Sequence, residues 1–212
     1  MSLAKKGILV VVSGFSGVGK GTLMKLLTER YGQYALSISA TTRSPREGEE
    51  DGREYFFRTR EAFEELIAKD QLVEYAEYCG NYYGTPREYV EDQMEQGRDV
   101  ILEIELQGAL KIREKFPEAL LLFIVPPDAE TLRNRLRGRN TETEEVIRRR
   151  LARAAEESEG IEKYDYIIVN DDLEQSMELM HHLIESQHNK TDRNLAFIHQ
   201  IQEEVRAFAK GE

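Results

Sequence analysis

The chain contains no tryptophan, one cysteine and five prolines in 212 residues. The lone Cys79 cannot form an internal disulfide, so a disulfide-stabilised scaffold is excluded and a reducing cytoplasm is favoured. No hydrophobic run approaches the roughly 20 residues that a membrane-spanning helix needs. A secretory signal is not expected, because Lys5 and Lys6 lead into a short apolar segment without a small-residue cleavage site.

Positive charge is also in short supply: 29 Lys and Arg stand against 40 Asp and Glu, which gives a net charge of −11. Bulk nucleic-acid binding needs a basic surface and is therefore disfavoured. Small anions are not excluded, because a pocket can be locally basic on an acidic protein. With 40% hydrophobic and 33% charged residues, the composition predicts a soluble globular chain long enough for a sizeable core.

The most informative segment is residues 8–22, an apolar run that leads into a glycine-rich loop. Gly14, Gly17 and Gly19 allow the backbone to curl so that successive N–H groups point inward. A helix beginning near Lys20 adds the positive end of its dipole, and the lysine adds a full charge. The segment predicts a cradle for a triphosphate formed by these residues: Gly14, Ser16, Gly17, Val18, Gly19, Lys20, Gly21 and Thr22.

The usual pattern of such a loop ends in Gly-Lys followed by Ser or Thr, but here Gly21 takes that last place. Thr22, one residue later, or bridging waters would then serve Mg²⁺. The alternative is a flexible strand-to-helix turn that binds nothing; the three glycines and the lysine disfavour it.

Short apolar runs alternate with segments of helical spacing along much of the chain. The expected strands are Ile8–Ser13, Val100–Ile104, Leu120–Val125 and Tyr166–Val169. The expected helices are Lys20–Tyr31, Gln107–Phe116, Ala129–Arg137 and Leu173–His188. This alternation predicts a three-layer α/β fold around a parallel sheet.

Two stretches interrupt the alternation and predict inserted units. Residues 38–88 are expected to form a small α+β subdomain, and the charge-dense residues 130–158 a helical flap. The core is then 1–37, 89–129 and 159–212. The last expected helix, Arg193–Lys210, has an apolar face that we expect to pack on this core, with a subunit contact as the alternative. The four histidines are expected in surface or packing roles, without a metal site.

Two arginines three residues apart, Arg43 and Arg46, lie in the first inserted stretch, and Pro45 stiffens the bend between them. Guanidinium groups are forked donors that suit a monophosphate. The hydroxyls of Tyr55 and Tyr83 could reach the same phosphate, or these rings could belong to a local hydrophobic cluster.

Four segments in the right order resemble guanylate kinase over roughly residues 7–175. They are Ser39–Glu49, Gly80–Gly84, Leu102–Gly108 and Tyr164–Leu173. The resemblance implies a P-loop NTPase core that holds ATP with Mg²⁺, residues 38–88 as the GMP-binding subdomain, and residues 130–158 as a lid.

The resemblance also implies roles for individual residues. For the GMP phosphate these are Arg43, Arg46, Tyr55 and Tyr83, and for guanine Ser39, Glu74, Thr85 and Glu105. Lid arginines that close on the transferred phosphate are Arg135, Arg139 and Arg150; Asn140 stands where glycine is usual. Asn170 and Asp171 would border adenine. Glu103 is a candidate for holding Mg²⁺ through water, beside Thr22. The other arginines of this region, Arg153 among them, are expected on the helix surface.

The chemistry of guanine supports the choice of Glu74. The Watson–Crick edge of guanine presents two adjacent donors that one carboxylate can accept, whereas adenine presents an acceptor there. A polar site that leaves buried groups unpaired can discriminate by ~10⁴ or more. Glu105 is longer than the aspartate common in the family, and Thr85 keeps the hydroxyl of the frequent serine.

The expected reaction is reversible transfer of the γ-phosphoryl group of ATP to GMP, with Lys20, Arg43, Arg135, Arg139 and Arg150 as the catalytic cations. Three alternatives remain open at this stage: a non-catalytic protein-binding domain of this fold, a kinase for another nucleoside monophosphate, and a P-loop switch protein. A switch protein is disfavoured because residues 189–192, the one Asn-Lys-x-Asp match, have no buried strand before them. A homo-oligomer is possible.

Overall fold

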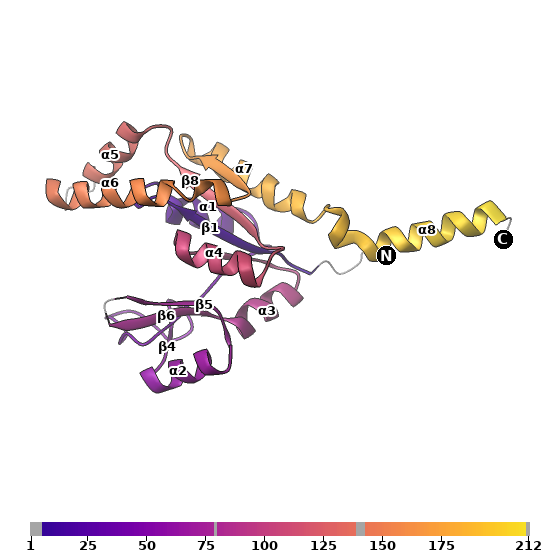
Figure 1. Ribbon diagram of the computed structural model, residues 1–212, viewed down its shortest axis with the longest axis horizontal. Coiled ribbons are helices and arrows are strands. Elements are labelled where there is room, and N and C mark those ends of the chain that lie inside the picture. The colour runs from indigo at the N-terminus through magenta and orange to yellow at the C-terminus, as the bar shows by residue number, and fades with distance from the viewer. Residues whose placement is uncertain (1–5, 79, 139–142, 211–212) are drawn as a thin grey trace.

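The structure is a computed structural model that describes residues 6–78, 80–138 and 143–210 (Figure 1). Its centre is a parallel five-stranded sheet in the order β2-β7-β1-β8-β9. The strands are β1 (Leu9–Gly14), β2 (Tyr34–Leu36), β7 (Asp99–Glu103), β8 (Leu120–Val125) and β9 (Tyr166–Val169). The four expected strands are confirmed, and the α/β fold class with them. The short edge strand β2 was not expected.

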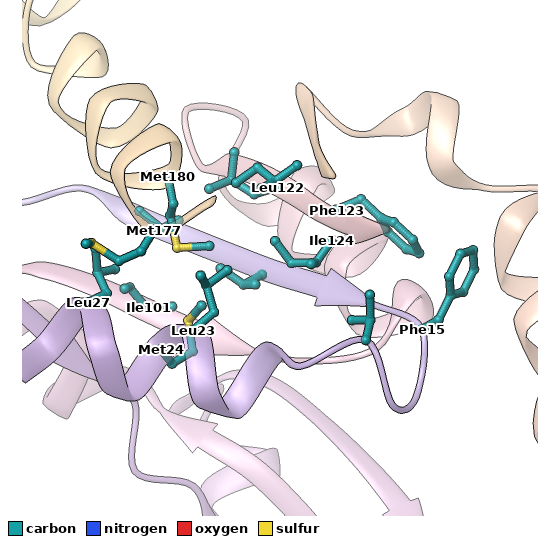
Figure 2. Packing of buried hydrophobic residues seen from close by; sticks show 14 of the residues in the cluster. Phe15, Leu23, Met24, Leu27, Ile101, Leu122, Phe123, Ile124, Met177 and Met180 are labelled. Atoms are coloured by element: carbon teal, nitrogen blue, oxygen red, sulfur yellow. The ribbon is translucent and has the colours of Figure 1, made fainter. Parts of the chain in front are cut away.

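The three central strands, β7, β1 and β8, are buried on both faces, which explains their apolar runs. The edge strand β9 is buried only at Ile168. Along β1, Val10 and Val12 point into one core and Leu9 and Val11 into the other. The first core is closed by α1 (Lys20–Arg30) and α7 (Leu173–Gln187), whose Met177 meets the α1 leucines in Figure 2. The second is closed by α3 (Arg87–Glu95) and α4 (Leu106–Lys115).

A second, four-stranded sheet lies below the first in Figure 1, in the order β4-β3-β6-β5. Its elements are β3 (Ala40–Thr41), β4 (Phe56–Phe57), α2 (Arg60–Ala68), β5 (Leu72–Tyr78) and β6 (Asn81–Pro86). Phe63 of α2 is fully buried against this sheet and stacks on Tyr82 at 5.2 Å between ring centroids. The small core gives this part of the chain a hydrophobic centre of its own.

Two helices, α5 (Ala129–Arg137) and α6 (Glu144–Ser158), follow β8 on the opposite side of the central sheet from the second sheet (Figure 1). Asp128 caps α5 by accepting a hydrogen bond from the Thr131 N–H at 2.6 Å. A 3₁₀ turn, Ile161–Lys163, leads from α6 to β9. Among the described residues, no helix combines the length and the apolar character that crossing a bilayer requires.

The C-terminal helix α8 (Leu195–Lys210) corrects an expectation, because it does not pack on the core. It follows the 3₁₀ turn Thr191–Asn194 and extends away from the rest of the molecule (Figure 1). None of its sixteen residues, all of them described, is buried, and Phe208 is 80% exposed. The amphipathic pattern indicated that one face needs cover, but it did not say where the cover comes from.

The expectation about the histidines holds only in part. The His188 Nε2 atom contacts the buried Asp99 Oδ1 at 3.0 Å, and Asp99 also accepts the backbone N–H of Ile8. Glu185 lies beside them, so three possible ligand atoms lie within 4.8 Å of one another. Asp99 is 89 residues away from His188 in the sequence, so local patterns could not predict this cluster. The contacts with His188 and with the Ile8 N–H already satisfy the Asp99 carboxylate.

Candidate functional site

The loop between β1 and α1 has the backbone shape that anion binding needs. Gly17 and Gly19 adopt φ angles of 87° and 97°, a region that residues with a side chain rarely occupy. A Cβ atom on Gly19 would also lie 2.8 Å from Asn170 Nδ2. Glycine is therefore required here on two counts, and the N-terminus of α1 opens directly onto the loop.

The Lys20 side chain folds back over this loop. Its Nζ atom donates to the carbonyl oxygens of Gly14 at 2.8 Å and Phe15 at 3.3 Å. Burial lowers the pKa of Lys20 from its ordinary value, and the negative charges of Glu103, Glu157 and Glu105 act in the opposite direction. The ammonium group is thus held at the place where a phosphate would need it.

Side chains from elements far away in the sequence form hydrogen bonds with Ser16 and Val18 of the loop. The buried Asn170 at the end of β9 donates its Nδ2 to the Val18 carbonyl at 2.8 Å. Arg135 of α5 donates to the same carbonyl at 3.4 Å, and Arg150 of α6 donates to Ser16 Oγ at 3.4 Å. The structure therefore brings two of the three expected lid arginines to the loop. Arg139 and Asn140 lie outside the described residues.

A cleft of about 630 Å³ opens beside the loop. Four parts of the chain contribute to it: the β1–α1 loop, the residue before β4, the end of β7, and α6. Its lining includes Gly14, Ser16, Lys20, Tyr55, Glu103, Glu105, Arg150, Arg153 and Glu157. Its lining contains both cations and carboxylates. A triphosphate with a divalent cation needs this mixture of charges.

Arg153 is exposed on the surface of α6, as expected, and it also lines the cleft. It contacts Glu105 across the cleft and Glu157 at 3.2 Å on its own helix. The pair with Glu105 links α6 to the start of α4. The helical spacing of Arg150, Arg153 and Glu157 places them on one face of α6, and that periodicity was the signal available in the sequence.

The two candidates for Mg²⁺ ligation are hard oxygen donors, as that ion requires. Glu103 lines the cleft, and its charge acts on Lys20 more strongly than that of any other carboxylate. Thr22 is exposed in the first turn of α1, next to Gly21. A Cβ atom at Gly21 would meet nothing within 4 Å. The donor set fits a magnesium ion held between the loop and the end of β7.

A second cationic site lies in the smaller sheet. The Arg43 guanidinium forms two hydrogen bonds with Glu49, at 3.0 and 2.9 Å, and lies over the Tyr55 ring at 5.3 Å from its centroid. The Tyr55 and Tyr83 rings are 6.0 Å apart, so both expected tyrosines flank this arginine. The Arg46 N–H donates to Glu49 at 2.7 Å. Glu49 organises the loop, a role that its place in the sequence did not indicate.

Glu74 lies on β5 opposite Thr85 of β6. The Thr85 hydroxyl is completely buried and donates to Glu74 Oε1 at 2.9 Å. Burial raises the pKa of Glu74 above its ordinary value, and the Thr85 hydrogen bond and the charge of Lys111 partly oppose that rise. Ser39, just before β3, accepts the Phe56 N–H on its backbone carbonyl and is half-buried.

Tyr55 connects the two halves of this site, because it lines the cleft and also contacts Arg43. Glu105 faces the cleft from the other side, paired with Arg153. Asp171 is exposed just after β9, beside the buried Asn170. The arrangement can hold one phosphate chain on the loop and a second anion on Arg43, with the cleft between them.

A larger cavity of about 700 Å³ lies between Phe15, the end of β8 and helices α5 and α6. Its lining is mostly apolar, with Leu132, Leu151 and Ala154 among the residues that contribute. None of the residues around it forms a cationic cradle like that of the loop. The smaller, charged cleft is therefore the candidate active site.

Comparison with known proteins agrees with this geometry. The family model of guanylate kinase matches residues 6–187. The guanylate kinase of Halalkalibacterium halodurans is 49% identical over 199 residues, covering 94% of this chain and 98% of the relative. That of Caldanaerobacter subterraneus subsp. tengcongensis is 48% identical over 204 residues, covering 96% and 99%. The crystal structure of guanylate kinase from Anaplasma phagocytophilum superposes with a TM-score of 0.70 at 34% identity, covering 92% and 94%. The chain belongs to the guanylate kinase family.

Proposed function

We propose that this chain binds ATP on the β1–α1 loop and GMP on residues 38–88, and transfers the γ-phosphoryl group between them reversibly, giving ADP and GDP. Membership of the guanylate kinase family makes it an ATP:GMP phosphotransferase. The division of labour within the chain is our inference. Residues 1–37, 89–129 and 159–212, apart from the projecting helix α8, form the core, and residues 130–158 act as the lid.

On the donor side, the loop residues Gly14 to Thr22 hold the triphosphate. Backbone N–H groups and the α1 dipole bind its oxygens, and the Lys20 ammonium leaves the Gly14 carbonyl to reach the phosphates. Mg²⁺, when bound, neutralises part of the phosphate charge; Thr22 and, through water, Glu103 would hold it. Asn170 and Asp171 border the adenine.

Asn170 also positions the β1–α1 loop on the donor side. Its Nδ2 is already engaged with Val18, so this residue shapes the loop as well as facing the base. The hydrogen bond between Asn170 and Val18 therefore fixes both the loop and the side chain that borders the adenine.

On the acceptor side, Arg43, Arg46, Tyr55 and Tyr83 hold the GMP phosphate. The Arg43–Glu49 pair supports this role, because a carboxylate holds the guanidinium in place before the phosphate arrives. Less motion of Arg43 is then lost when GMP binds.

Glu74, with Ser39, Thr85 and Glu105, reads the guanine base. Thr85 occupies part of the Glu74 carboxylate, whose remaining lone pairs can accept the N1–H and the 2-amino group of guanine. Adenine would present an acceptor to the same oxygens and be rejected.

The transfer needs no dedicated base, because the attacking oxygen of GMP is already a phosphate anion. Catalysis is positioning and charge neutralisation. Lys20, Arg43, Arg135, Arg139 and Arg150 supply the positive charge, the last three from the lid. Lid and acceptor subdomain close together and exclude water that would otherwise hydrolyse ATP. Closure requires the contact between Arg153 and Glu105 to open or shift, since Glu105 is needed at the base.

The observation that carries the proposal is the shared cleft, in which the loop lysine and an acceptor-side tyrosine face the same space. A coupled assay that offers ATP with GMP, AMP, UMP or dTMP tests it. We expect turnover with GMP and at most a trace with the other three. Equal turnover with AMP would contradict the base-reading site, and no turnover with any acceptor would contradict the catalytic assignment.

We further propose that the partners of the chain are these nucleotides and neither nucleic acid nor membrane, and that it works in the cytoplasm. The net charge of −11 and the single cysteine support this.

A further inference from the structure

Ser13 is the polar exception in the apolar strand β1. It is 1% exposed and lies on the face of the strand that also buries Leu9 and Val11. A hydroxyl group in such a place is costly unless it is paired, and its Oγ atom donates to the Ile104 carbonyl at 2.6 Å. The bond joins residues 91 positions apart in the chain, so the sequence did not indicate it.

This hydrogen bond connects two parts of the charged cleft. On one side, Ser13 is followed directly by Gly14, which begins the β1–α1 loop. On the other side, Ile104 stands between Glu103 and Glu105, and all three residues line the cleft. At 1% exposure Ser13 is too deep to touch a bound nucleotide, so it acts on the cleft through Ile104.

Two hydrogen bonds fix the peptide groups on both sides of Ile104. The ladder between β1 and β7 ends at the pair Val12 and Glu103. Beyond it, the Ile104 N–H donates to the Val12 carbonyl at 3.3 Å, and the Ile104 carbonyl accepts from Ser13. The N–H belongs to the peptide plane shared with Glu103, and the carbonyl belongs to the plane shared with Glu105. The backbone that carries both carboxylates is therefore attached to β1, directly before the loop.

Tyr164 shields this hydrogen bond from solvent. Its hydroxyl group is buried, and its ring packs edge-on at 5.0 Å against Phe123, the residue of β8 that pairs with Ser13. Burial raises the pKa of Tyr164 to about 12, while the neighbouring Ser13 hydroxyl acts in the opposite direction. A hydrogen bond in such low-dielectric surroundings is stronger than one in water. One hydroxyl group can thus hold the turn at Ile104 in place.

We propose that Ser13 is a positioning residue, whose hydroxyl group fixes Glu103 and Glu105 relative to the β1–α1 loop through Ile104. The inference rests on the proposed roles of these two residues, Glu103 toward Mg²⁺ and Glu105 toward guanine. Through this one bond, both carboxylates keep a fixed position relative to the triphosphate site. Removing the hydroxyl group leaves the Ile104 carbonyl without its donor and loosens the turn.

The loop has supports of its own that do not involve Ser13. Asn170 and Arg135 both donate to the Val18 carbonyl, and the Lys20 ammonium closes the loop over two carbonyl groups. Ser13→Ala should therefore spare the binding of a triphosphate without metal and weaken the binding that uses the two carboxylates. The loss of one neutral hydrogen bond corresponds to an effect of about 2- to 10-fold.

Isothermal titration calorimetry on the full chain tests this inference. It measures Kd for GMP and the factor by which Mg²⁺ strengthens the binding of a non-hydrolysable ATP analogue. We expect Ser13→Ala to raise the Kd and to lower the Mg²⁺ factor by about 2- to 10-fold each, with the Kd of the metal-free analogue unchanged.

The matched control is Ser176→Ala. Ser176 is 3% exposed, and its hydroxyl group donates to the Val169 carbonyl of β9 at 3.1 Å. The control should lower Tm as Ser13→Ala does and change neither the Kd for GMP nor the Mg²⁺ factor. Unchanged values of both quantities in Ser13→Ala, or equal changes in the control, would overturn the inference.

Double variants test whether Ser13 acts through the two carboxylates. Ser13→Ala should add nothing to the loss of GMP affinity in Glu105→Gln, and nothing to the loss of the Mg²⁺ factor in Glu103→Gln. Additive losses would show an independent role and overturn the inference. The single carboxylate variants separate the inference from the function on which it rests. If they lose affinity and Ser13→Ala does not, only the inference fails; if they bind like the unmodified chain, their proposed roles fail and the inference with them.

Discussion

Replacing Glu74 with glutamine removes the charge that we assign to guanine recognition and leaves almost the same shape. An amide oxygen can accept one of the two guanine donors, but the amide NH₂ group then faces the other donor. A hydrogen bond to a charged group contributes about 1.5–3 kcal/mol, and a neutral one about 0.5–1.5 kcal/mol. Losing one bond and making the other neutral therefore costs about 2.5–4.5 kcal/mol, which corresponds to a fall of ~10² to ~10³ in kcat/KM for GMP.

The measurement is steady-state kinetics with GMP and with AMP as acceptors. We expect most of the loss with GMP and little change with AMP, so that the preference for GMP collapses. Glu77→Gln is the matched control, since Glu77 is on the same strand and about half exposed. Wild-type discrimination in the Glu74 variant would refute the base-reading role.

The same substitution has a consequence for stability. Burial raises the pKa of Glu74 in the folded chain above the ordinary value of 4.5. The stability that this group contributes is therefore present at low pH and lost as the pH rises through the raised pKa. Glu74→Gln should thus raise Tm at pH 7, with the difference shrinking toward pH 4. For the unmodified enzyme, the acid limb of kcat/KM for GMP should have its midpoint above pH 4.5. A lower Tm at pH 7 would show that the carboxylate is stabilised by its surroundings.

Three further substitutions probe the donor side. Lys20→Ala should lower kcat by ~10³-fold or more and leave Tm nearly unchanged. The control, Lys25→Ala at an exposed position of α1, should change neither kcat nor Tm. Near-normal turnover of the Lys20 variant would remove Lys20 from the mechanism. Gly21→Ala should raise the unfolding free energy by about 0.4–1 kcal/mol in denaturant titrations, because its site on α1 is open, and a loss would reveal a hidden clash. Asn170→Ala should cost about 0.5–1.5 kcal/mol of stability, because it removes the nearer of the two donors to the Val18 carbonyl and leaves Arg135. It should also raise KM for ATP more than for GMP; equal effects would count against its place at the ATP site.

The elements of the core could be predicted because their signals are local. The segment from Leu9 to Arg30 specifies a strand, a loop and a helix through apolar residues, glycines and helix formers that are neighbours in the chain. The caps of α5 and α7 are equally local, because Asp128 and Asp172 each accept a hydrogen bond from the backbone N–H three residues further on. The strand β2 escaped notice because three residues, Tyr34–Leu36, are too few to show a period.

What could not be predicted depends on residues far apart in the chain. The contact of Arg153 with Glu105 joins residues 48 positions apart, and Asn170 reaches Val18 across 152. Nothing local marks such partners. The prediction for helix α8 was wrong for a different reason. Its apolar face was correctly predicted, but an apolar face does not indicate which surface covers it.

The residues that we propose for the acceptor site were chosen by type and by resemblance, and the structure adds how they are held. Arg43 is fixed by Glu49, and Glu74 is fixed by Thr85. Arg43 and Glu49 lie in the one segment that joins β3 to β4, whereas Glu74 and Thr85 lie on neighbouring strands. The Glu74–Thr85 contact depends on the register of β5 with β6, which the sequence alone does not specify.

The most direct test of the account is a crystal structure with GMP and a non-hydrolysable ATP analogue bound together. We expect the guanine beside Glu74, the GMP phosphate on Arg43, and the triphosphate on the loop with Lys20 turned toward it. We also expect Arg153 to have left Glu105. A GMP molecule bound away from Glu74 and Arg43, or a triphosphate away from the loop, would contradict the account.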